Sequence, residues 1–124
     1  MNAERACRDE GPLDRLRDRL RAFATARDWN QFHSPKNLAI ALSVEAGELL
    51  EHFQWISDND SQTLPPGKLG EVEEEMADVL LYLIRLADML DVELLQAADK
   101  KIEANARKYP VEKSCGSSKK YTEL

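Results

Sequence analysis

The stretch of residues 71–90, which reads EVEEEMADVLLYLIRLADML, constrains the fold more than any other part of the chain. Its apolar residues recur at spacings of three and four, which is typical of a helix with one buried face. That apolar stripe consists of Val72, Met76, Val79, Leu80, Leu83, Leu86, Ala87 and Leu90. Glu75 and Asp78 lie beside the stripe, with Tyr82 between them around the helix axis. Acids in this position face the neighbouring helix, where they repel one another unless a cation joins them.

A second stretch, residues 38–56, repeats this arrangement in the sequence LAIALSVEAGELLEHFQWI. Its apolar stripe consists of Leu38, Leu42, Leu49, Phe53 and Ile56. Glu45 falls within the stripe, and Glu48 falls on its edge three residues later. Two such helices together provide several carboxylates, which are the ligands that a hard divalent cation prefers. The predicted metal ligands are Glu45, Glu48, Glu75 and Asp78.

The length of 124 residues suits one domain, and a composition with 43% hydrophobic and 32% charged residues is that of a globular protein. The formal net charge of −6 disfavours binding to a nucleic acid polymer, which depends on neutralising phosphates. A bound metal ion would still allow one small phosphorylated ligand to bind.

The sequence also indicates where the protein is found. The first ten residues, MNAERACRDE, are too charged for a signal peptide, and no apolar run is long enough to cross a membrane. Cys7 and Cys115 belong to no metal-binding motif, so we expect free thiols in a reducing compartment. We therefore expect a cytoplasmic protein with no membrane partner.

Turn residues divide the chain into four expected helices without any strand. Pro12 begins the first helix, and Ser34 followed by Pro35 is a strong start for the second. Asp91 is expected to cap the fourth helix. The expected helices span residues 12–28, 35–56, 68–90 and 92–108. The sequence thus predicts an all-α, four-helix-bundle-like domain over residues 12–110, a flexible N-terminal tail over residues 1–11 and a C-terminal tail over residues 111–124.

The second and third expected helices are apolar over more than one narrow seam. One protomer of four helices cannot bury all of this surface, so a second copy of the chain is the expected partner. The sequence does not decide between a homodimer and a homotetramer.

Other side chains are suited to a phosphorylated ligand. Lys101, Asn105 and Lys108 share one face of the fourth expected helix and can donate to phosphate oxygens, although a basic last turn is also common in helices. Trp29 and Trp55 can stack on a nucleobase, or they can anchor a core or an interface.

Four segments resemble the MazG-like all-α NTP pyrophosphatases, and within them the dCTP pyrophosphatase branch. These segments are RDWNQFHSPKNLAIALSVEAGELLEHFQW, EEEMADVLLYLIRLAD, KKIEANARKYP and the terminal SSKKYTEL. The resemblance implies an enzyme that cleaves a nucleoside triphosphate, dCTP in this branch, to the monophosphate and pyrophosphate. It also implies Mg²⁺ as cofactor and an assembly of helical protomers.

The resemblance assigns roles to individual residues. Mg²⁺ would be held by Glu45, Glu48, Glu75 and Asp78, and Glu48 is our candidate for the catalytic base. The base pocket would be lined by Trp29, His33 and Trp55. The triphosphate would be contacted by Tyr82, Lys101 and Asn105, with Lys108 and Tyr109 beside them.

Three other interpretations remain. A pyrophosphatase with broad base specificity would share the same site. A non-enzymatic helical interaction module would carry the acids only as a solvated face. A di-iron carboxylate bundle would need ExxH pairs, and neither acidic pair is followed by such a histidine.

Overall fold

A computed structural model describes residues 11–124, and these residues form helices and no strand. The all-α prediction is therefore confirmed for the described part of the chain. The four long helices are α1 (Pro12–Ala26), α2 (Pro35–Glu51), α4 (Pro66–Met89) and α5 (Leu94–Lys108). The short elements are η2 (Asn30–Phe32), α3 (Asp58–Ser61), α6 (Val111–Ser114) and η3 (Tyr121–Glu123). No helix in residues 11–124 is long and apolar enough to span a bilayer.

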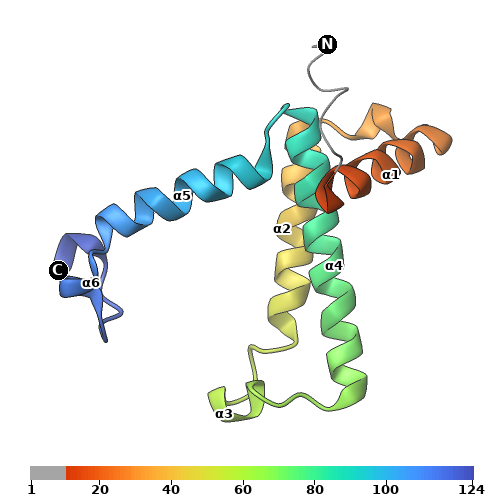
Figure 1. The fold of residues 1–124 in the computed structure, drawn as a ribbon. Helices are drawn as coiled ribbons and strands as arrows, with labels where there is room; N and C mark the ends of the chain where they lie inside the picture. The colour runs from red at the N-terminus through yellow and green to blue at the C-terminus, as the bar shows by residue number, and fades with distance from the viewer. Residues whose placement is uncertain (1–10) are drawn as a thin grey trace. The chain divides into compact units, whose positions relative to one another are not determined.

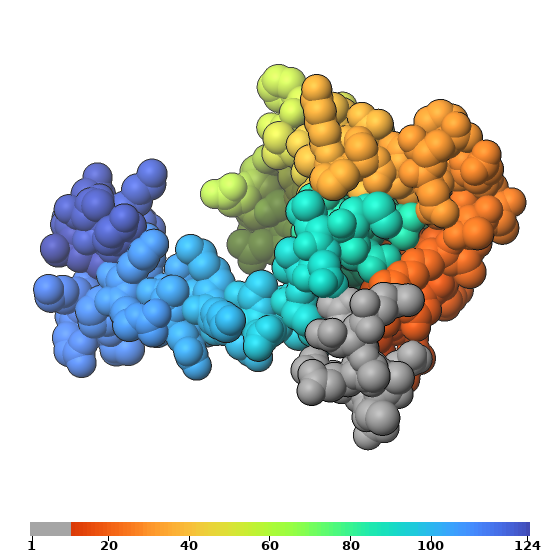
Figure 2. Space-filling view, turned by 90° about the horizontal axis from the view of Figure 1, so that it is seen from above, coloured from red at the N-terminus to blue at the C-terminus, as the bar shows by residue number. Residues whose placement is uncertain are grey.

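The chain divides into two compact units, of which the first ends at Asp91 and the second is Val92–Leu124. In the first unit α2 and α4 run antiparallel, side by side, and α1 crosses the C-terminal end of α4 (Figure 1). Seen from above, the side chains of α1 and of this end of α4 pack together (Figure 2). The core is small, and its buried apolar residues are Ala24, Leu38, Val72, Ile84 and Ala87.

Two helix starts agree with the sequence prediction because local capping fixes them. Ser34 caps α2, and its hydroxyl accepts a hydrogen bond of 3.2 Å from the Asn37 backbone N–H. Gly11 precedes α1, and its N–H donates to the Asp14 carboxylate at 3.1 Å. The rest of the expected N-terminal tail, including Cys7, lies outside the described residues.

Two helix boundaries differ from the prediction. The second helix was expected to reach Ile56, but α2 ends at Glu51. The His52 and Phe53 N–H groups bond to carbonyls three residues back, which tightens the last turn, and the aromatic residues that follow are weaker helix formers. Asp91 does not cap α5. It adopts a left-handed conformation with φ 56°, which Asp tolerates, and α5 begins only at Leu94.

The second unit consists of α5, α6 and η3. The Tyr109 and Tyr121 rings meet edge to face with centroids 6.0 Å apart, and the Lys108 Nζ lies 5.0 Å from the Tyr121 centroid. The segment expected to be a C-terminal tail thus contains helical turns, and its last tyrosine contacts the end of α5. Cys115 has a free, exposed thiol, as expected.

Candidate active site

Three of the four predicted metal ligands converge between α2 and α4. Glu45 and Glu48 lie one turn apart on α2, and Glu75 faces them from α4. Carboxylate oxygens of the three residues lie within 4.8 Å of one another. We call these three residues the acidic cluster. Its geometry follows from the spacing of three residues, which places both acids of α2 on the side that packs against α4.

Within residues 11–124, no basic side chain forms an ion pair with the acidic cluster. The Oε2 atoms of Glu45 and Glu75 are buried and accept no hydrogen bond from residues 11–124. Burial, hydrogen bonds with Glu48 and Glu75, and the charges of Glu48 and Asp78 raise the pKa of Glu45 to about 7. Burial and the Glu48 charge also raise the pKa of Glu75. Buried oxygens without donors are the arrangement that a divalent cation would satisfy, so the cluster fits a metal site.

Asp78, the fourth predicted ligand, is exposed and lies one helical turn after Glu75 on α4. It is not part of the acidic cluster, but its negative charge contributes to the raised pKa of both Glu45 and Glu75. Asp78 also lines a cavity of about 680 Å³. It therefore connects the acidic cluster with this cavity.

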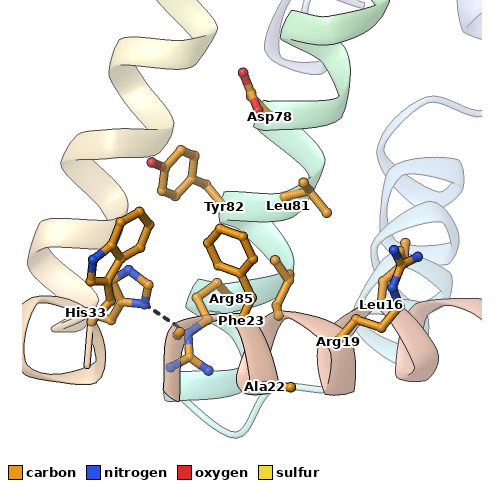
Figure 3. Close-up of a pocket in the computed structure, with 12 residues that line it drawn as sticks. Leu16, Arg19, Ala22, Phe23, His33, Asp78, Leu81, Tyr82 and Arg85 are labelled. Atoms are coloured by element: carbon orange, nitrogen blue, oxygen red, sulfur yellow. Dashed lines mark hydrogen bonds between the residues drawn. The ribbon is translucent and has the colours of Figure 1, made fainter. Parts of the chain in front are cut away.

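The cavity lies against α1 and α4, and the segment between α1 and α2 closes part of it. Its lining includes Leu16, Leu20, Phe23, Trp29, His33, Asp78, Leu81, Tyr82 and Arg85. The Trp29 ring meets Phe23 edge to face at 5.6 Å and His33 at 6.3 Å. Asp78 lies at one end of the cavity, and His33 and Arg85 lie at the other (Figure 3). Three residues predicted to meet the substrate, Trp29, His33 and Tyr82, thus share one cavity.

Arg85 is a cavity residue that the sequence analysis did not single out. Its side chain is buried, with 4% of its surface exposed, and it donates three hydrogen bonds. The acceptors are His33 Nδ1 at 3.1 Å, Asn30 Oδ1 at 2.6 Å and Asp88 Oδ2 at 3.3 Å. The available signal was one arginine between Ile84 and Leu86 in an apolar run, since a buried charge needs partners.

Five predicted substrate-binding residues remain. Trp55 is in the first unit but does not line the cavity, and the other four are in the second unit. Trp55 follows the end of α2, and 87% of its side-chain surface is exposed. Lys101, Asn105 and Lys108 lie on α5 in the second unit, with Tyr109 at its C-cap. The three α5 residues are exposed and share a helix face, as their spacing predicts.

The fold agrees with comparisons to known proteins. The chain belongs to the MazG-like family, whose sequence profile matches residues 40–124. Its relatives include dCTP pyrophosphatase 1 of Mus musculus, which is 46% identical over 117 residues. The Homo sapiens protein of the same name is 44% identical over 117 residues. Each match covers 93% of this chain and 69% of the relative.

A solved structure supports the same fold. The crystal structure of a pyrophosphatase from Archaeoglobus fulgidus DSM 4304 superposes with a TM-score of 0.77 at 43% sequence identity. The superposition covers 83% of this chain and 96% of that protein. The predicted family is therefore confirmed.

Proposed function

We propose that this protein is a dCTP pyrophosphatase that hydrolyses dCTP to dCMP and pyrophosphate with Mg²⁺ as its metal. One observation carries the proposal: an unpaired acidic cluster lies one helical turn from Asp78, at the end of an aromatic-lined cavity. The relatives named dCTP pyrophosphatase 1 support the reaction and the substrate. A cavity of about 680 Å³ is in the size range of small-molecule sites.

The two parts of the site have different tasks. Glu45, Glu48 and Glu75 would hold the metal, and Asp78, which lines the cavity, would complete the ligand set. The cavity takes the base, with Trp29 as the stacking ring and His33 at the base edge. Tyr82, which lines the cavity, is proposed to contact the triphosphate. Lys101, Asn105, Lys108 and Tyr109 of the second unit keep the substrate-binding role that the family resemblance implies.

The residues support one hydrolytic step. A metal held by the acidic cluster would supply positive charge that offsets the phosphates and polarises a water molecule. Glu48 accepts a proton from that water as its oxygen forms a bond to the α-phosphorus. The bond between the α-phosphorus and the bridging oxygen breaks, and pyrophosphate leaves with that electron pair. A cation would stabilise the charge that develops on the leaving group, and the family resemblance implies this role for Lys101 and Lys108.

A second copy of the chain is the proposed partner. Leu69, Met76, Leu80 and Leu83 recur along one side of α4 at spacings of seven, four and three, and between 37% and 57% of each side chain is exposed. We call these four residues the α4 apolar strip. Ile40 and Val44 on α2 are also more than half exposed. A continuous apolar strip of this kind is typical of an interface, so we propose a homodimer or a homotetramer. The exposed thiol of Cys115 fits the reducing cytoplasm as its location.

The test is a panel of the four deoxynucleoside triphosphates, assayed for pyrophosphate release with and without Mg²⁺. We expect the highest kcat/KM for dCTP and no turnover without the metal. Equal values for all four substrates would instead identify a pyrophosphatase of broad specificity. An interaction module would release no pyrophosphate, and Mg²⁺ would not change its melting temperature.

A further inference from the structure

The contact between Arg85 and His33 fixes the position of a proton. Arg85 Nε donates a hydrogen bond of 3.1 Å to His33 Nδ1. A guanidinium has only donors and stays charged at every pH of interest. The partner nitrogen, His33 Nδ1, must therefore be an unprotonated acceptor. A neutral imidazole with an unprotonated Nδ1 carries its proton on Nε2.

Other contacts hold this arrangement in place. Arg85 Nη1 also donates to Asp88 Oδ2 and Nη2 to Asn30 Oδ1, so each of the three guanidinium nitrogens makes a hydrogen bond. Burial and the Arg85 charge both lower the pKa of His33, which keeps the ring neutral. His33 Nε2 makes no hydrogen bond within residues 11–124, although the ring lines the cavity (Figure 3). Nε2–H is thus a donor that is free to bind a ligand.

We propose that Arg85 is a positioning residue for base selection: it holds His33 as the Nε2–H tautomer, and that donor reads N3 of the pyrimidine. This inference rests on the proposed function. Cytosine has an unprotonated N3 that accepts a hydrogen bond, whereas N3 of thymine and uracil carries a hydrogen. A fixed donor at this edge therefore accepts cytosine and rejects thymine, because two donors would face each other. The opposite tautomer would remove this discrimination.

The tautomer can be measured without substrate. A long-range proton–nitrogen correlation spectrum of the ¹⁵N-labelled protein at neutral pH distinguishes protonated from unprotonated imidazole nitrogens. The chain has two histidines, and the signals lost in His33→Gln identify those of His33. We expect a protonated Nε2 and an unprotonated Nδ1. A protonated Nδ1, or a doubly protonated ring, would overturn the proposal.

A matched pair of variants separates positioning from structural support. Glutamine has an amide nitrogen at the place along the side chain where arginine has Nε, whereas methionine has a methyl group there. Arg85→Gln and Arg85→Met both lose the charge and the forked guanidinium, but only Arg85→Gln keeps a donor for His33 Nδ1. We expect Arg85→Met to lower the ratio of kcat/KM for dCTP to that for dTTP by about tenfold or more, and Arg85→Gln to keep most of it.

The outcomes distinguish this proposal from the proposed function. If Arg85 has only a structural role, both variants should lose stability and activity together, and the ratio of kcat/KM for dCTP to that for dTTP should be equal in the two. That result would overturn the proposal. If Arg85→Met does not fold, the wild-type tautomer and the dCTP to dTTP ratio of kcat/KM in Arg85→Gln still test the proposal. Loss of that ratio in Arg85→Gln, which keeps a donor for His33 Nδ1, would contradict the proposal. A wild-type protein with the expected tautomer but no hydrolysis of dCTP would defeat the proposed function and base selection, while leaving the role of Arg85 toward His33 intact.

Discussion

At the scale of single residues, the acids of the site were predictable because their placement is a local property. Glu45 and Glu48 fall beside the apolar stripe of one helix, and Glu75 falls beside that of another, so packing the stripes brings the acids together. Arg85 was not predictable in this way. Its acceptors on Asn30 and His33 are 55 and 52 residues away along the chain, and no local pattern pairs residues at that separation.

The first prediction concerns the acids of the site. Glu45→Gln or Asp78→Asn should lower kcat by more than about 100-fold, since even outer partners of metal ligands cost about 10–100-fold. Glu45→Gln should also raise the melting temperature of the metal-free protein, because it removes a buried, unpaired carboxylate. Thermal unfolding and pyrophosphate release, each with and without Mg²⁺, measure both effects. Glu74→Gln, at an exposed position of the same helix, is the control with the same change of charge. Full activity in Glu45→Gln or Asp78→Asn would exclude that residue from the metal site.

The second prediction concerns the base. Trp29→Ala should raise KM for all four deoxynucleoside triphosphates by a similar factor of roughly tenfold, because every base stacks on an aromatic ring. His33→Ala should instead narrow the difference in kcat/KM between dCTP and dTTP. Steady-state kinetics with the four substrates distinguish the two effects. Phe32→Ala, which removes an exposed ring from the same segment, should change neither KM nor the preference for dCTP over dTTP. A loss confined to dCTP in Trp29→Ala would contradict stacking as the role of Trp29.

At the scale of secondary-structure elements, the helix boundaries that local capping determines were predicted more accurately than the others. Ser34 and Pro35 fix the start of α2 by local hydrogen bonding and a restricted backbone. The start of α5 was not predictable in this way, because Asp occurs both as a helix cap and in the left-handed conformation that Asp91 adopts. The packing of α1 against α4 was also beyond the sequence, because Arg21 and Asp88 pair across 67 residues.

The third prediction tests this link between α1 and α4. Arg21 donates two hydrogen bonds to the Asp88 carboxylate, at 2.7 and 2.5 Å. Burial alone would raise the pKa of Asp88, but the Arg21 hydrogen bonds and the charges of Arg21, Arg85 and Arg17 lower it overall. The carboxylate therefore contributes stability above its unfolded pKa of about 3.9, and this contribution is lost as the pH falls through the lower folded value.

Asp88→Asn should accordingly lower the free energy of unfolding by about 1–3 kcal/mol at neutral pH. The difference from wild type should shrink as the pH falls from about 5 to about 3. Urea unfolding at several pH values measures it, with Asp99→Asn at an exposed position of α5 as control. A difference that stays constant over this range would show that the carboxylate charge does not stabilise the contact.

At the scale of the whole molecule, the sequence predicted the fold class and an excess of apolar surface, but not the division of the chain after Asp91. Periodic apolar stripes predict helices from the local sequence alone. The boundary between compact units instead depends on long-range contacts. Of the stripe predicted for the third helix, Val72 and Ala87 are buried, while Met76, Leu80 and Leu83 remain exposed. That exposed part is the basis of the proposed assembly.

The fourth prediction concerns this assembly. Leu80→Glu places a charge in the α4 apolar strip and should reduce the mass measured by light scattering to that of one chain, because burying an unpaired charge is costly. The wild-type protein should have the mass of at least two chains. Thr63→Glu, at an exposed position outside the strip, should keep the wild-type mass. An active wild-type protein with the mass of one chain would contradict the proposed oligomer.

The unequal exposure of the two tryptophans gives the unlabelled protein two optical reporters. Trp29 lines the cavity with 43% of its surface exposed, whereas Trp55 is 87% exposed outside it. A base stacked on Trp29 would quench the emission of that indole. A second copy covering Trp55 would shift its emission to shorter wavelength and shield it from a dissolved quencher. Because the chain has only these two tryptophans, single replacements by phenylalanine would assign each spectral change, so that intrinsic fluorescence follows occupancy and association separately.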